Sequence, residues 1–162
     1  MDGYTVNIGC LLFSKSMRRH WGTANNFCQF EAGGTLAEVS TEMQFDFVRT
    51  QLALQEVDGS NVWWTSGTDV GVDGVWNILY STNIYSDNRH IILIHTGVWK
   101  WATSYSAVGD FIWTEGSPPT AHRTQNCLAL SLFHDNHTID FMGVNTHCDT
   151  TGAFPICQIK PL

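Results

Sequence analysis

The sequence has few charged residues and no long apolar run, and these absences exclude several classes of partner. Charged residues make up 14% of the chain, and eight Lys and Arg against fifteen Asp and Glu give a net charge of -7. Nucleic acids and anionic membranes attract clustered Lys and Arg, whereas the one basic cluster here is Arg18-Arg19. The stretch HIILIHTGVW at 90–99 is shorter than the roughly 20 apolar residues of a membrane span. We therefore expect no nucleic acid as a partner and no membrane span.

Motifs of the common enzyme and zinc-site classes are missing as well. The sequence has no Gly-x-Ser-x-Gly elbow, no glycine-rich phosphate loop and no His-Glu-x-x-His pair. No two of the five cysteines are separated by only two residues, which excludes a zinc ribbon and a Cys-x-x-Cys redox pair. The seven histidines share no ligand motif with the cysteines. We expect a binding protein without a metal or other cofactor, not an enzyme.

What the sequence does contain is typical of a secreted globular domain. Hydrophobic residues make up 43% and seven residues are tryptophan, and a length of 162 residues fits a single domain spanning 1–162. Widely spaced cysteines in a chain with few charges indicate disulfide bonds and an extracellular location. Asn136-His137-Thr138 is a glycosylation acceptor triplet. The N-terminus lacks the basic start and apolar core of a signal peptide, so we interpret the sequence as a mature chain.

The pattern along the chain predicts an α+β fold. Residues 4–13 are typical of a strand, and residues 18–34 of a helix that ends at Gly33-Gly34. A second helix follows Ser40 or Thr41, with Phe45, Val48 and Leu52 at helical spacing. Beyond residue 58, short runs between turns predict a mostly antiparallel sheet: NVWWTSG, GVWKW, NCLALSLF, TIDFM and AFPICQI. Residues 77–96 are interpreted as an insertion.

An ordered set of phrases resembles the C-type lectin-like domain family. The set comprises Trp21-x-x-Ala24-x-x-x-Cys28, GGTLA at 33–37, VWWTSGTD at 62–69, GVWKW at 97–101, FIWTEGSPP at 111–119, NCLAL at 126–130 and FPICQ at 154–158. The resemblance extends from Cys10 to the C-terminus, and WTSGTD and PICQ are more similar to invertebrate members. It implies two helices, antiparallel sheets and a long-loop region, with disulfides Cys28–Cys157 and Cys127–Cys148. Cys10 is then left over, either as a free thiol or as an interchain disulfide that makes a dimer.

Sugar-binding members of this family hold a calcium ion, and the resemblance places its ligands at positions where this chain lacks carboxylates. The family's Glu-Pro-Asn or Gln-Pro-Asp triplet aligns with Ser117-Pro118-Pro119, and the carboxylate before the third cysteine aligns with Gln125. The Asn-Asp pair aligns with Val144-Asn145, or with Asp140 in another register. Calcium takes six to eight oxygen ligands, several of them usually carboxylates. We expect no calcium at this position, and a structural calcium at Glu42, Asp46 or Asp69 stays an alternative.

A sugar can also be held without a metal, by an aromatic face together with carboxylate and amide groups. An N-acetylated sugar suits such a set, because its acetamido N–H meets a carboxylate and its C=O meets an amide N–H. The candidate contacts are Tyr105, Asp110, His122, Asn126 and Asn145. Each also has an ordinary interpretation: Tyr105 and His122 as loop residues, Asn126 as a strand cap, and neighbouring Trp113 as core.

These observations lead to one main hypothesis of function and two alternatives. The main hypothesis is a secreted, calcium-independent lectin for glycans that end in N-acetylhexosamines (GlcNAc or GalNAc), which the resemblance connects with innate recognition of glycans. A dimer linked through Cys10 would raise avidity by presenting two weak sites together. The alternatives are a domain that binds protein or mineral surfaces, since one fold hosts many functions, and a calcium-dependent lectin that uses the other register.

Overall fold

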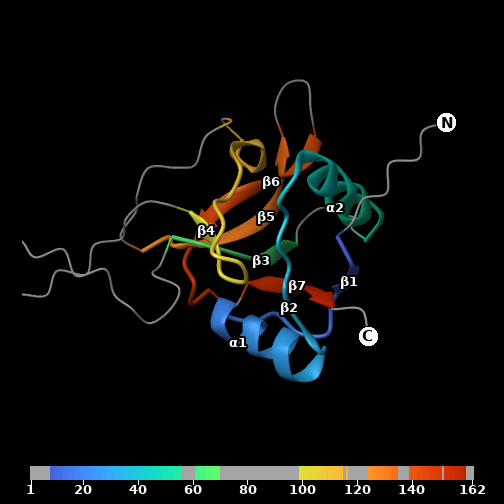
Figure 1. Ribbon diagram of the computed structural model, residues 1–162, viewed down its shortest axis with the longest axis vertical. Helices are drawn as coiled ribbons and strands as arrows, with labels where there is room; N and C mark the ends of the chain where they lie inside the picture. The colour runs from blue at the N-terminus through green and yellow to red at the C-terminus, as the bar shows by residue number, and fades with distance from the viewer. Residues whose placement is uncertain are drawn as a thin grey trace, which may run out of the picture.

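The computed structural model describes residues 8–55, 61–69, 99–114, 116, 124–134, 139–150 and 152–159 (Figure 1). The expected insertion at 77–96 lies outside these residues. The strands are β1 (Cys10–Phe13), β2 (Gly34–Leu36), β3 (Val62–Thr68), β4 (Lys100–Trp101), β5 (Cys127–His134), β6 (Ile139–Thr146) and β7 (Ala153–Ile159). The helices are α1 (Trp21–Asn26) with a π-helical turn η1 (Phe27–Glu31), α2 (Glu42–Gln55) and a 3-10 turn η2 (Asp110–Ile112). The fold class is α+β, as expected.

Two local sequence signals act at helix ends, Gly33 after the first helix and Thr41 before the second. The α-helical part of the first helix ends earlier than predicted, because the chain continues as the wider π turn η1. Gly33 follows with φ 74°, a left-handed conformation that glycine adopts without steric cost. Thr41 caps α2, since its Oγ1 accepts a hydrogen bond from the Gln44 amide at 3.2 Å.

The strands form a mixed sheet in the order β1-β7-β3-β5-β6, with β2 added beside β7 and β4 beside β3. The pairing is mostly antiparallel, as expected, with one exception: β3 pairs with β7 in parallel through Val62↔Ala153 and Trp63↔Phe154. The long chain segment between these two strands allows the parallel return, which no hairpin can make. Thr68 pairs with Cys127 of β5 and with Lys100 of β4, so β4 and β5 lie on opposite edges of β3.

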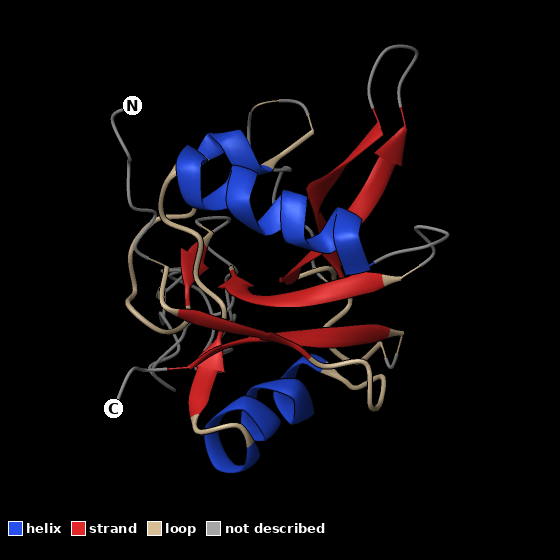
Figure 2. Ribbon diagram, turned by 90° about the vertical axis from the view of Figure 1, so that its right-hand side faces the viewer, coloured by secondary structure: helices blue, strands red, loops and turns tan. Residues whose placement is uncertain are grey.

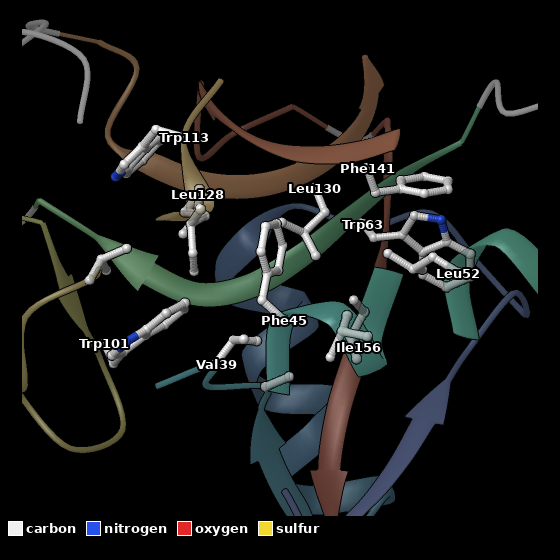
Figure 3. Packing of buried hydrophobic residues seen from close by; sticks show 14 of the residues in the cluster. Val39, Phe45, Leu52, Trp63, Trp101, Trp113, Leu128, Leu130, Phe141 and Ile156 are labelled. Carbon is white, nitrogen blue, oxygen red and sulfur yellow. The ribbon is translucent and has the colours of Figure 1, made fainter. Parts of the chain in front are cut away.

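The two helices cover opposite faces of the strands (Figure 2). Successive residues of a strand point to opposite faces, and Trp63 and Trp64 accordingly enter two different clusters. The larger cluster, on the α2 side, contains Phe45, Trp63, Leu128 and Ile156 (Figure 3). The smaller cluster, on the α1 side, is made of Ala24, Cys28, Leu36, Trp64, Cys127, Ala129, Ala153 and Cys157.

Both expected disulfides are present in the structure. Cys28–Cys157 joins η1 to β7, and Cys127–Cys148 joins the start of β5 to the segment after β6. Cys10 is an exposed free cysteine at the start of β1, a strand at the end of the sheet path. The disulfides therefore hold the α1 side of the fold together, and Cys10 stays available at its edge.

Candidate functional site

The first group of candidate residues lies where β3 ends and β5 begins. Asn126 is buried, with 7% of its surface exposed, and its backbone carbonyl accepts hydrogen bonds from Thr68 Oγ1 (2.7 Å) and the Asp69 amide (3.2 Å). Asp69 is also buried, with 3% exposed. The backbone of Asn126 thus helps to join two strands, as expected of a strand cap, and Asn126, Asp69 and Thr68 form a group of buried polar residues there.

A pair of neutral amides lies beside this group. Asn145 is on β6 opposite Leu128 of β5, and its Nδ2 donates a hydrogen bond to Gln125 Oε1 at 3.2 Å. Both side chains are half-buried. Because each side-chain amide has two N–H donors and an oxygen with two lone pairs, this one hydrogen bond leaves both residues with further donor and acceptor positions.

This donor set does not fit a calcium ion. Gln125 and Asn145 supply only neutral oxygens, and the Gln125 oxygen is already used by the Asn145 amide. Calcium sites usually combine several carboxylates to offset the loss of hydration. Among the residues that the structure describes, no group of three or more His, Cys, Asp and Glu could hold a metal ion. Of the acids proposed for a structural calcium, Asp46 pairs with Arg49.

The second candidate position is a tight turn that follows β4. Lys100 bridges Ala107, and the Trp101 amide donates to the Ser106 carbonyl at 2.9 Å, which joins the two arms of the turn. Tyr105 lies in this turn with φ 63°, the one positive φ of a non-glycine residue in the described ranges. Its side chain is 52% exposed. Such a conformation costs a residue other than glycine roughly 1–3 kcal/mol, so the surrounding structure must hold it.

A carboxylate from a distant part of the chain holds this turn. Glu38, between β2 and α2, accepts hydrogen bonds from Thr103 Oγ1 (2.5 Å), Ser106 Oγ (3.3 Å) and Ser40 Oγ (2.8 Å). Ser104 and Ser106 hydroxyls lie 2.5 Å apart. Figure 1 shows the turn in yellow, next to the cyan segment that leads from β2 to α2.

The protonation of Glu38 reflects these contacts. Partial burial raises the pKa of the carboxyl group, but hydrogen bonds from Thr103, Ser104, Ser40 and Ser106 together outweigh it. The pKa of Glu38 therefore lies below its ordinary value of 4.5. At neutral pH the group is an anion whose charge is spread over hydroxyl donors.

The structure divides the predicted contact residues between separate places. Tyr105 follows β4, whereas Asn145 is on β6, and β3 and β5 lie between these strands. At the usual strand separation, three spacings place β4 and β6 roughly 14 Å apart. Asp110 is exposed at the start of η2, which packs against α2 through Phe111 and Phe45.

The remaining predicted residues lie outside the described ranges or in the core, and one candidate residue was not predicted. His122, the triplet Ser117-Pro118-Pro119 and Asn136 lie outside the described residues. Trp113 is a core residue, 3% exposed and packed on Trp99 with ring centroids 4.9 Å apart. Glu38 was not predicted, and the signal that could have found it is the hydroxyl-rich phrase TSYS, whose donors need a nearby acceptor.

Comparison with solved structures identifies the fold. The C-type lectin domain of murine dendritic cell inhibitory receptor 2, in complex with N-glycan, matches with a TM-score of 0.59 over 94% of this chain and 91% of that chain, at 14% identity. The SPL-1–GlcNAc complex matches with a TM-score of 0.54 over 91% of this chain and 85% of that chain, at 20% identity. The chain has a C-type lectin-like fold. The resemblance inferred from the cysteines and tryptophans is thereby confirmed.

Comparisons by sequence found no relative. No family model matches the sequence, and no curated protein matches it. Both solved structures share fewer than a quarter of their residues with this chain, so they establish its fold and not its ligand. No helix in the described ranges is long and apolar enough to cross a membrane.

Proposed function

We propose that this C-type lectin-like domain binds carbohydrate. The observation that carries the proposal is the match along most of both chains to domains solved with N-glycan and with GlcNAc. The surface chemistry suits such ligands, because Tyr105 offers an exposed aromatic face and the Asn145–Gln125 pair offers neutral hydrogen-bonding groups. Aromatic rings pack on the apolar faces of sugars, while amides bond their polar substituents.

Binding is calcium-independent and favours N-acetylhexosamines in this proposal. Calcium independence is supported by the side chains at this position, since the Gln125 and Asn145 amides are hydrogen-bonded to each other and carry no charge. Support for the preference for N-acetylhexosamines is chemical, because an acetamido group brings both an N–H donor and a C=O acceptor to amides and carboxylates. Tyr105, Asp110, His122, Asn126 and Asn145 remain the proposed contacts.

A glycan array run with calcium and again with EDTA tests the function. Equal signal on GlcNAc- and GalNAc-terminated glycans in both conditions is expected. Loss of signal in EDTA alone contradicts calcium independence, and silence in both conditions contradicts carbohydrate binding. Asn145→Ala should reduce the signal, with Asn26→Ala, an exposed asparagine on α1, as the matched control.

The proposal includes secretion and a dimer linked through Cys10. Two disulfides suit an oxidising compartment. The thiol of Cys10 is exposed at the edge strand β1, next to Leu12, which is 40% exposed. Non-reducing electrophoresis of the wild type should give a dimer band that Cys10→Ser abolishes, and a wild type that runs as a monomer contradicts the dimer.

A second candidate function is binding to a protein partner, and one observation favours it. Helix α2 exposes Met43, Phe47 and Leu54, at 45%, 38% and 75%, on the side opposite its buried residues. A surface helix usually has polar residues there. Silence on the glycan array, combined with self-association or partner binding that Leu54→Ser removes, would favour this function.

A further inference from the structure

The turn that follows β4 places a tyrosine, an unusual residue type for this conformation, at a left-handed backbone position. Tyr105 adopts φ 63° in an exposed position, where glycine or asparagine would adopt it at lower cost. The aromatic ring is half exposed and belongs to neither core cluster. A strained, exposed aromatic residue is a pointer to function, because neither packing nor backbone preference selects it.

The hydroxyl groups beside Tyr105 are oriented by a single carboxylate. Thr103 donates to Oε2 of Glu38, and Ser106 and Ser40 both donate to its Oε1. A hydroxyl whose hydrogen points to a carboxylate has only its lone pairs left for other partners. The exposed surface of the turn therefore offers hydrogen-bond acceptors next to an aromatic face.

We infer that Glu38 is the positioning residue of a sugar-contact surface formed by the turn 103–106, with the Tyr105 ring as its platform. The inference rests on the proposed carbohydrate binding and says where one contact lies and what holds it. The ligand is a pyranose that packs an apolar face on Tyr105 and donates O–H or acetamido N–H groups to the Ser104 and Ser106 hydroxyls. Glu38 acts through the turn, without touching the sugar.

This surface differs from the position that the family resemblance indicated. The Gln125–Asn145 pair lies on the far side of β3 and β5, about three strand spacings away. One monosaccharide cannot contact both the Tyr105 turn and the amide pair, so the two places can be tested separately. Substitutions in the turn should change binding without altering the amide pair, and the reverse holds for Asn145.

The test measures GlcNAc affinity by titration calorimetry for matched variants of the full chain. Tyr105→Ala should weaken binding about 10-fold, and Tyr105→Phe, which keeps the ring, should stay within about 2-fold. Tyr105→Gly should lose binding to the same extent without loss of thermal stability, because glycine adopts the positive φ freely. Phe30→Ala, at an aromatic residue 81% exposed on η1, is the control and should leave affinity unchanged.

Glu38 is tested in a double-mutant cycle. Glu38→Gln should weaken binding about 3- to 10-fold in the wild type, and should have no further effect in the Tyr105→Ala background. Amide hydrogen exchange at residues 103–106 should become faster in Glu38→Gln. The matched control is Glu42→Gln, an exposed acid in the first turn of α2, which should change neither quantity.

The outcomes separate this inference from the proposed function. A wild type that binds GlcNAc while Tyr105→Ala binds equally well overturns the inference and leaves carbohydrate binding intact. Additive losses in the double variant, or unchanged exchange in Glu38→Gln, overturn the positioning role of Glu38. A wild type that binds no N-acetylhexosamine overturns the proposed function and the inference together.

Discussion

The two disulfides should stabilise the domain to different extents, because they close loops of very different length. Cys28 and Cys157 are separated by 129 positions, and Cys127 and Cys148 by 21. In the chain-entropy model, closing these loops restricts the unfolded chain by about 4.9 and about 3.3 kcal/mol at 25 °C. Removing the long-loop disulfide should therefore cost about 1.6 kcal/mol more than removing the short-loop one.

Packing acts in the same direction as loop length. Cys28 and Cys157 are fully buried, with 0% of their surface exposed, whereas Cys148 is only partly buried. Replacing both members of a pair by alanine removes two sulfur atoms, and the vacated volume costs more where the surroundings are closed. The difference between the two double variants is thus expected to be at least that of the entropy model.

The assay is urea unfolding at pH 7, followed by tryptophan fluorescence and far-ultraviolet circular dichroism. Total stability of such domains is about 5–15 kcal/mol, so the loss of this disulfide can unfold the domain. If Cys28→Ala/Cys157→Ala does not fold in buffer, all variants are unfolded at several osmolyte concentrations and their stabilities are extrapolated to buffer. Cys10→Ala removes a thiol without opening a loop, so it is the control and should keep the wild-type midpoint. An equal or larger loss in Cys127→Ala/Cys148→Ala would refute the loop-length reasoning.

Three further predictions concern the sheet, the α2 contact and the Glu38 turn. Gly34→Ala should cost about 1–3 kcal/mol in urea unfolding, because its Cβ would lie 2.1 Å from the Gln158 carbonyl oxygen; Gly22→Ala, whose Cβ meets nothing within 4 Å, should not destabilise. Arg49→Met should lower stability by about 1 kcal/mol or less in the same assay, since Arg49 and its partner Asp140 are partly exposed. Because the folded pKa of Glu38 is lowered, its stabilisation of the turn is complete above pH 4.5 and is lost as pH falls through that lower pKa. Exchange protection at 103–106 should drop in that acidic range in the wild type, and a constant protection would contradict the role of the carboxylate.

The sequence predicts the strands well where burial alone decides them. NVWWTSG becomes β3 and AFPICQI becomes β7, and most residues of both strands are buried, as in strands that are covered on both faces. Their parallel pairing could not be predicted, since the residues of a strand do not encode which neighbour it has or in which direction. The π turn after Asn26 could not be predicted either, because the apolar spacing of Trp21, Ala24 and Cys28 fits an α-helix equally well.

The disulfide pairing was predictable only through the resemblance to a family. Four cysteines allow three pairings, and the sequence by itself does not choose among them. The structure adds a reason for the observed choice: Cys28, Cys127 and Cys157 all face the α1 side and share one buried cluster. A one-residue change in strand register would turn these side chains to the other face, so the disulfides and the register support each other.

The candidate contacts were less predictable, because fold resemblance specifies a backbone position and not the chemistry found there. Just before β5 and near the end of β6, the position at which the family's sugar-binding members hold calcium carries the neutral amides Gln125 and Asn145, which are hydrogen-bonded to each other. A stronger indication of function is a residue whose backbone conformation is unfavourable for its type. Tyr105 holds a conformation that glycine would adopt without cost, and Glu38 accepts hydrogen bonds from Thr103 and Ser106, which hold the turn around it. Neither folding nor packing accounts for an exposed aromatic ring at that point, and this is the ground on which we propose Tyr105 as a sugar contact.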